Sequence, residues 1–251
     1  MREYVRRVDF DAFQGNGYEH EIMFVGDNAR VIASHVGVGG AAPAQHIHEV
    51  DQLYYVCFGE MQVQLGSEIF SAGPNTLVHI PAGTPHHNWN EGSVPEFHFE
   101  MLAPGPNPDY QPWQEVESTD AGDRPYFVKS LDPDRSAWDT IEPGYDRTVF
   151  LRTDNAMLYL AELAPGGQTP GTHVHRHDQF YYVLEGELRA EIALDTYVLP
   201  PHHLAILPAG VPHRVWNDSG STERHLVVNA PLLPPEPSTG RGDIPVAFSR
   251  A

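Results

Sequence analysis

Histidines gather in two similar stretches of the chain, "QHIHEVDQLYYV" (45–56) and "THVHRHDQFYYV" (172–183). Each stretch contains two histidines two residues apart and a glutamine four residues later. In a β-strand, residues i and i+2 point to the same face, so each histidine pair projects together and the glutamine can share that face. The residues are His46, His48 and Gln52 in the first stretch and His173, His175 and Gln179 in the second.

A third imidazole follows each stretch at the same distance. The segments "PAGTPHHNWN" (81–90) and "PAGVPHRVWN" (208–217) share a Pro-x-Gly turn that delivers His86 and His213. Three neutral imidazole nitrogens and one amide oxygen suit Fe, Mn, Co, Ni or Zn as divalent ions, and they leave positions open for water or substrate. A lone buried histidine is more often a hydrogen-bonded core residue, but two copies at one spacing favour a metal. We therefore predict up to one divalent transition metal in each half of the chain.

The whole chain is a tandem repeat. An offset of 127 residues aligns both histidine stretches, both Pro-x-Gly segments and His98 with His225 without a gap. Such a long register indicates a duplicated domain. A segment rich in Pro, Gly and acids at 103–125 is the predicted linker, so we expect domains at 1–122 and 123–251.

Each half shows the pattern of β structure. "MQVQL" (61–65) alternates apolar and polar residues, as a half-buried strand does. Pro and Gly interrupt the sequence every ten residues or so, which is typical of short strands in a sandwich or barrel. No long segment has apolar residues at the helical period. The prediction is an all-β chain with two domains.

Composition limits the partners. The formal charge of −19 in 251 residues argues against nucleic acid or an anionic membrane surface, both of which need clustered Lys and Arg. No apolar run is long enough to span a membrane, and the first residues lack the apolar region of a signal peptide. The single cysteine, Cys57, fits a reducing compartment, so a cytoplasmic protein is expected, as a monomer or homodimer that acts on a small molecule.

At these residues the chain resembles the cupin family, and specifically the bicupins. The first cupin motif, G-x5-HxH-x3–4-E-x6-G, is matched from Gly40 to Gly59 and from Gly167 to Gly186, except that Gln replaces Glu. The end of the second motif, PxGxxHxxxN, is matched at 81–90 and 208–217. The resemblance implies two double-stranded β-helix (jelly-roll) barrels, each with a metal inside. It is close to quercetinase-like bicupins and to the bicupin isomerase of bacilysin biosynthesis.

The glutamines limit the chemistry that these residues can perform. An amide has no useful basicity at neutral pH, so a proton acceptor must come from elsewhere or the substrate must ionise on the metal. His98 and His225 are candidate bases or hydrogen-bond partners of the site. Tyr54 and Tyr181 should point into the barrels, where a phenol could donate to a substrate oxygen or simply pack.

Three functions remain open. The leading hypothesis is a metal-dependent dioxygenase that acts on a small enolisable or phenolic substrate. The alternatives are a non-redox isomerase, cyclase or lyase with the same metal-enolate chemistry, and a non-catalytic barrel that binds a small ligand. Arg30 could meet a substrate carboxylate at a barrel mouth, although its repeat partner is Met157, and His177 is expected at the surface or rim.

Overall fold

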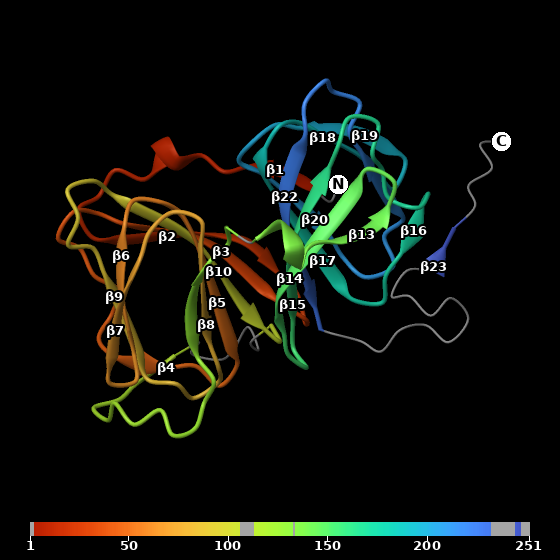
Figure 1. The fold of residues 1–251 in the computed structure, drawn as a ribbon. Helices are drawn as coiled ribbons and strands as arrows, with labels where there is room; N and C mark the ends of the chain where they lie inside the picture. Colours follow the sequence, from red (N-terminus) through yellow and green to blue (C-terminus); the bar gives the residue numbers. More distant parts are fainter. Residues whose placement is uncertain (1–2, 106–112, 133, 232–243, 247–251) are drawn as a thin grey trace. The chain divides into compact units, whose positions relative to one another are not determined.

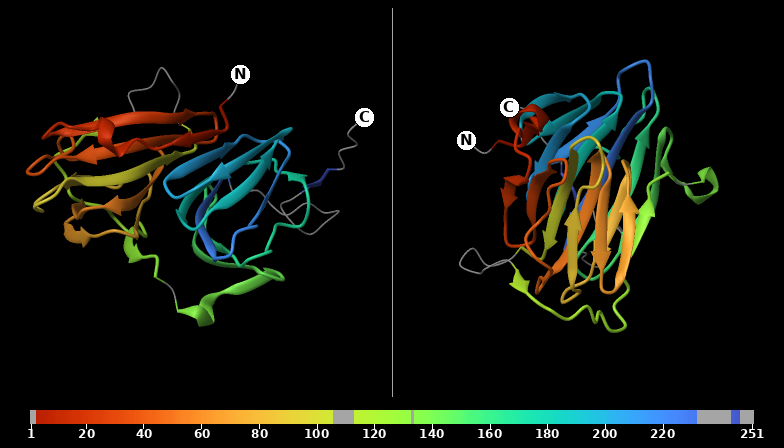
Figure 2. Two further views of the ribbon diagram at one scale, coloured as in Figure 1. Left: turned by 90° about the horizontal axis from the view of Figure 1, so that it is seen from above. Right: turned by 90° about the vertical axis from the view of Figure 1, so that its left-hand side faces the viewer.

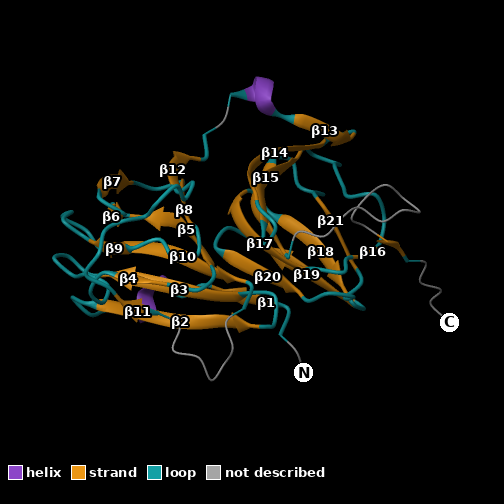
Figure 3. Ribbon diagram, turned by 90° about the horizontal axis from the view of Figure 1, so that it is seen from below, coloured by secondary structure: helices purple, strands orange, loops and turns teal. Residues whose placement is uncertain are grey.

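The computed structural model describes residues 3–105, 113–132, 134–231 and 244–246. The chain forms two compact units, each a barrel of antiparallel strands (Figures 1 and 2). The described residues contain only two short 3-10 helices, η1 (Phe10–Ala12) and η2 (Arg135–Ala137), so the predicted all-β class is confirmed (Figure 3).

The first barrel consists of a six-stranded and a five-stranded sheet. The six-stranded sheet has the order β12-β8-β5-β10-β3-β2, and the five-stranded sheet has the order β11-β4-β9-β6-β7. The strands are β2 (Tyr18–Val25), β3 (Arg30–Val36), β4 (His46–Ile47), β5 (Asp51–Phe58), β6 (Met61–Leu65), β7 (Glu68–Ala72), β8 (Thr76–Ile80), β9 (His86–Trp89), β10 (Glu96–Ala103), β11 (Gln114–Glu115) and β12 (Phe127–Ser130).

The second barrel repeats this plan. Its larger sheet has the order β1-β20-β17-β22-β15-β14-β13, and its smaller sheet has the order β19-β18-β21-β16-β23. The strands are β1 (Val5–Arg7), β13 (Asp139–Glu142), β14 (Tyr145–Arg152), β15 (Met157–Leu163), β16 (His173–Val174), β17 (Asp178–Glu185), β18 (Leu188–Ile192), β19 (Asp195–Leu199), β20 (His203–Leu207), β21 (His213–Trp216), β22 (Glu223–Ala230) and β23 (Ile244–Pro245).

The strand pattern follows from alternation and from turn glycines. In β6 the burial alternates strictly, with Met61, Val63 and Leu65 inside the first barrel, as the sequence predicts. Gly59 and Gly186 end the first motif of each repeat with φ of 72° and 74°. A Cβ on Gly186 would lie 2.7 Å from the Thr222 carbonyl oxygen, so glycine is required on both conformational and steric grounds.

The division of the chain differs from the predicted boundary at 122/123. One unit comprises residues 9–132, and the other comprises residues 133–251 together with residues 1–8. The reason is pairing: β1 joins β20 of the second barrel, with Val5 opposite Ala205, and β12 joins β8 of the first barrel, with Val128 opposite Val78 (Figure 3). Part of the predicted linker is also structured, because β11 pairs with β4; residues 106–112 lie outside the described residues.

Candidate metal centres

The structure brings three histidines together inside each barrel. Their ligand atoms lie within 4.8 Å of one another in each group, and all six side chains are buried. In each barrel the first histidine begins the short strand β4 or β16, and the second directly follows that strand. The third begins β9 or β21, which pairs with that strand. The groups are His46, His48 and His86 in the first barrel and His173, His175 and His213 in the second.

The backbone fixes the tautomer of these rings. His46 Nδ1 lies 2.9 Å from the carbonyl oxygen of Ala44, and His213 Nδ1 lies 2.9 Å from that of Val211. The same contact to the residue two positions earlier recurs at His86 and His173. Because a carbonyl only accepts, Nδ1 carries the proton and the lone pair of Nε2 is left for a ligand.

Burial keeps these imidazoles neutral. It lowers the pKa of His46, and it lowers the pKa of His86 and His213 well below the ordinary value, with the neighbouring imidazoles adding to the effect in both. His86 Nε2 is buried and makes no hydrogen bond to any described residue. Neutral, buried nitrogens directed at one point match the requirements of a transition-metal site.

A tyrosine and a second polar residue orient the glutamine of each repeat. In the second barrel Tyr181 Oη donates to Gln179 Oε1 at 2.6 Å, and Gln179 Nε2 donates to Asn229 Oδ1 at 2.9 Å. In the first barrel Tyr54 Oη donates to Gln52 Oε1 at 3.2 Å. Burial raises the pKa of both tyrosines well above the usual value, so they remain hydrogen-bond donors at neutral pH.

One contact in the second barrel joins the glutamine to the histidines. Gln179 Oε1 lies 3.0 Å from His213 Nε2. Both atoms carry lone pairs that can bind one divalent metal ion. The residues present therefore fit a divalent transition metal held by the three histidines, with the glutamine oxygen beside them.

His98 and His225 are also buried, each against a carboxylate. His98 Nδ1 lies 2.9 Å from Glu96 Oε2, and His225 Nδ1 lies 2.9 Å from Glu223 Oε2. Burial lowers the pKa of His98, but the carboxylates of Glu96 and Glu100 outweigh burial and raise it to about 10. A histidine that holds its proton this firmly is suited to ion pairing with Glu96 and Glu100. The roles of His98 and His225 as bases stay predictions.

Sequence reasoning missed Glu100, a buried carboxylate of the first barrel. Glu100 accepts hydrogen bonds from Gln52 Nε2 at 2.8 Å, from Ser34 Oγ at 2.6 Å and from Tyr18 Oη. Burial raises its pKa, but the charge and hydrogen bond of His98 outweigh burial and hold it well below the usual range. By the repeat offset its counterpart is Val227, and Asn229 holds the glutamine instead. The absence of a repeat partner is why the sequence did not single it out.

His177 was expected at the surface or rim, and this prediction is wrong. The residue is only 7% exposed, and its ring stacks on His175 with centroids 4.5 Å apart. Burial and the neighbouring charged groups lower its pKa to about 3, so the imidazole is neutral. His177 thus adds a fourth ring to the histidines of the second barrel. Its counterpart in the first barrel is Val50.

Segments that follow each barrel in sequence lie along the histidine strands. Glu115 of β11 pairs with His46, and Trp113 packs on the His46 ring at 5.5 Å between centroids. In the second barrel Pro245 of β23 pairs with His173. Each histidine strand is thus covered on the edge away from β9 or β21 by a further strand of the same sheet.

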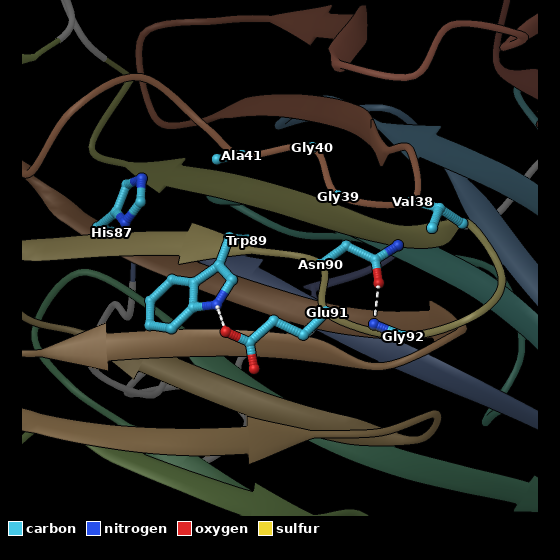
Figure 4. Close-up of a pocket in the computed structure, with 9 residues that line it drawn as sticks. All are labelled: Val38, Gly39, Gly40, Ala41, His87, Trp89, Asn90, Glu91 and Gly92. Atoms are coloured by element: carbon cyan, nitrogen blue, oxygen red, sulfur yellow. Dashed lines mark hydrogen bonds between the residues drawn. The ribbon is translucent and has the colours of Figure 1, made fainter.

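A separate surface pocket of about 460 Å³ lies on the first barrel (Figure 4). It is lined by Val38, Gly39, Gly40, Ala41, His87, Trp89, Asn90, Glu91 and Gly92. Trp89 donates from Nε1 to Glu91 at 2.8 Å, and Asn90 accepts from the Gly92 amide (Figure 4). None of the clustered histidines lines this pocket, so it is distinct from the candidate metal centre. The described part of the chain also contains no helix that could cross a membrane.

Comparison with known proteins assigns the fold. The cupin domain family model matches residues 34–101 and 159–229. No curated protein sequence matches the chain. A cupin 2 conserved barrel domain protein from Leptotrichia buccalis has a similar structure, with a TM-score of 0.66 and 11% identity over 91% of this chain and 98% of that chain.

Two further solved structures share the fold. Salicylate 1,2-dioxygenase from Pseudaminobacter salicylatoxidans has a TM-score of 0.67 and 14% identity, and the alignment covers 81% of this chain and 71% of that chain. A putative glyoxylate induced protein from Pseudomonas aeruginosa has a TM-score of 0.67 and 16% identity, over 86% of this chain and 82% of that chain. With one model matched in each half and two barrels that each enclose a histidine triad, the chain belongs to the cupin family and is a bicupin.

Proposed function

We propose that this bicupin is a metal-dependent enzyme, a dioxygenase that acts on a small enolisable or phenolic substrate. The observation that carries the proposal is the buried histidine triad of each barrel, whose ligand atoms lie within 4.8 Å of one another. Salicylate 1,2-dioxygenase, which has the same fold, acts on a phenolic substrate according to its name, and this agrees with the proposal.

The residues of the site support chelation of a substrate. When bound, a divalent metal supplies Lewis acidity and, with Fe, a route to O₂. The ligand set contains no carboxylate, so the charge of the ion is not cancelled and acidifies a bound enol or phenol. Tyr54 and Tyr181 hold the glutamine oxygens in place, and the buried rings exclude water. Ionisation of the substrate hydroxyl on the metal, with its proton released to solvent, would replace the general base that a motif glutamate provides.

Oxygen-electrode measurements test the proposal. The Fe(II)-loaded protein is offered β-diketones, 2-oxo acids, phenols and flavonols, and stoichiometric O₂ uptake with at least one class is expected. Substrate conversion without O₂ uptake would instead establish the isomerase, cyclase or lyase alternative. Binding of a substrate without conversion, with each of Fe, Mn, Co, Ni and Zn tested in turn, would establish a ligand-binding barrel.

A further inference from the structure

The larger sheet of the first barrel places an arginine in line with the metal-site glutamine. Gln52 lies directly opposite Leu102, and Leu102 lies directly opposite Arg30. Residues directly opposite one another in antiparallel strands share a face of the sheet. The Gln52 side chain lies inside the barrel, where it bonds to Tyr54 and Glu100, so Arg30 lies on the interior face, two strands or about 10 Å away.

The second barrel also has an arginine in the equivalent pair of facing residues, but on the other strand of that pair. Gln179 lies opposite Asn229, which lies opposite Met157, and Met157 lies opposite Arg152. In the first barrel the equivalent pair is Arg30 with Val25. The repeat offset pairs Arg30 with Met157 and Arg152 with Val25, so it hides the fact that each barrel keeps one arginine in this pair. The Arg152 guanidinium extends along the row toward the glutamine, because its Nη2 lies 3.2 Å from Met157 Sδ.

Neither guanidinium has a carboxylate partner among the described residues. Arg30 Nε is buried without a hydrogen bond to any of them, and the one hydrogen bond of Arg152 goes to a thioether, which is a weak acceptor. Two other arginines of the second barrel pair with carboxylates, Arg224 with Glu162 and Arg214 with Glu191. Arg147 instead lies over the ring of Tyr159. Arg30 is half-buried and Arg152 is exposed, so both guanidinium groups, in rows that lead to the metal-site glutamines, are accessible to an anionic ligand.

We propose that Arg30 and Arg152 bind a carboxylate of the substrate, so the natural substrates are small anionic chelators, such as dioxo acids, whose other oxygens reach the metal. This inference rests on the proposed function and narrows its substrate class. A guanidinium offers two parallel N–H donors to a carboxylate, which fixes the orientation of the substrate as well as its affinity. The local positive charge also offsets the net charge of −19, which otherwise repels anions.

A matched pair of probes tests the proposal. 2,4-Dioxopentanoate and pentane-2,4-dione carry the same β-diketone, and only the first carries a carboxylate. Cobalt(II) is first titrated into the full-length protein, and both probes are then measured by calorimetry and by the visible spectrum of the bound cobalt. The wild type is expected to bind the carboxylate probe at least about tenfold more tightly than the neutral probe.

Substitutions identify the residues responsible. In the double variant Arg30→Met with Arg152→Met, the preference for the carboxylate probe is expected to disappear while affinity for pentane-2,4-dione stays within about twofold. The control Arg214→Met removes an outward-facing arginine of the second barrel and should keep the preference. A triple variant combines Arg30→Met with Arg152→Val and Met157→Arg. It moves the arginine of the second barrel to the strand that carries the arginine in the first barrel. This variant should keep the preference for the carboxylate probe.

The outcomes separate the carboxylate assignment from the proposed function. Equal affinities of the wild type for both probes, or a preference that survives the double variant, would overturn the carboxylate assignment while cobalt binding leaves the metal centres standing. An equal loss of both probes in the double variant would also overturn it, because the arginines would then serve the structure alone. Failure to bind cobalt would overturn both proposals.

Discussion

Four of the six clustered histidines share one local arrangement, in which Nδ1 contacts the carbonyl oxygen two residues earlier. This contact both selects the tautomer and limits rotation of the ring. A metal therefore meets nitrogens that are already oriented, and little side-chain entropy is lost on binding.

Removing the third histidine of a barrel should remove one metal site. His86→Ala and His213→Ala are each expected to lower the bound metal from two ions per chain to one, since two imidazoles and an amide hold a divalent ion weakly. Metal analysis after dialysis measures this. His87→Ala is the matched control, because His87 follows His86 on β9 and lines the surface pocket instead. Two metals retained in both variants would contradict the assignment of the triads.

The ion pairs of His98 predict how stability varies with pH. Its folded pKa of about 10 lies above the unfolded value of 6.5, so its stabilising contribution is complete below pH 6.5 and is lost as the pH rises through 10. In the metal-free protein, the free energy of unfolding should fall between pH 7 and 10. In Glu100→Gln, which removes one carboxylate partner and so lowers the folded pKa of His98, the fall should be smaller and should end at lower pH. Urea unfolding at several pH values measures both, and parallel curves would contradict the pairing.

Among single residues, the sequence predicted those site residues that occur in both repeats. The histidines and glutamines of both repeats could be found because spacing and duplication marked them. Glu100 and His177 could not, since each occurs in one barrel only. Arg152 could not either, because its relation to Arg30 depends on which residues lie opposite each other across two strands.

Among the elements, the turns that follow β9 and β21 are held by the motif asparagines. Asn217 Nδ2 donates to Leu163 O at 2.7 Å and to Ser221 O at 2.8 Å, and its Oδ1 accepts from the Ser219 amide at 2.9 Å. Asn90 makes the equivalent bonds to Val36, Val94 and Gly92. These residues thus connect β21 to β15 and β9 to β3, and they do not touch the metal ligands.

Asn217→Ala should therefore destabilise the protein without emptying its metal sites. Four hydrogen bonds of a buried side chain are lost, including one from Ser219 Oγ, which costs about 4 kcal/mol in the free energy of unfolding. Denaturant unfolding measures this cost, and metal analysis should still find two ions per chain at low temperature. Loss of the metal with unchanged stability would show that the asparagine serves the site directly.

The strands themselves were largely predictable. Alternation identified β6, and the Pro and Gly residues marked the ends of short strands, so the all-β class followed. The two-residue strands β4 and β16 carry too few residues for a periodic pattern. Their place was set by pairing with β9 and β21, which a local reading of the sequence does not contain.

In the whole molecule, each barrel includes a strand from outside its own half of the repeat. Strands β1 and β12 take corresponding places: Val5 and Val128 occupy equivalent edges of opposite barrels. The boundary at 122/123 could not be corrected from sequence, because a short strand carries no mark of the sheet it joins.

This exchange predicts how fragments behave. A fragment of residues 9–132 contains every described strand of the first barrel and should fold and bind one metal. A fragment of residues 1–122 lacks β12, which leaves β8 as an unpaired edge, and it should aggregate or unfold at lower temperature. Light scattering and thermal unfolding compare the two, and equal stability would show that β12 contributes little.

The exchanged strands also bear on how such a gene can change after duplication. A deletion that removed either copy would strip a strand from the survivor and expose its sheet to association with other chains. Mutations can then erode the chemistry of one barrel while its presence stays under selection as a scaffold. Differences such as Glu100 against Val227 could accumulate in this way without loss of either half.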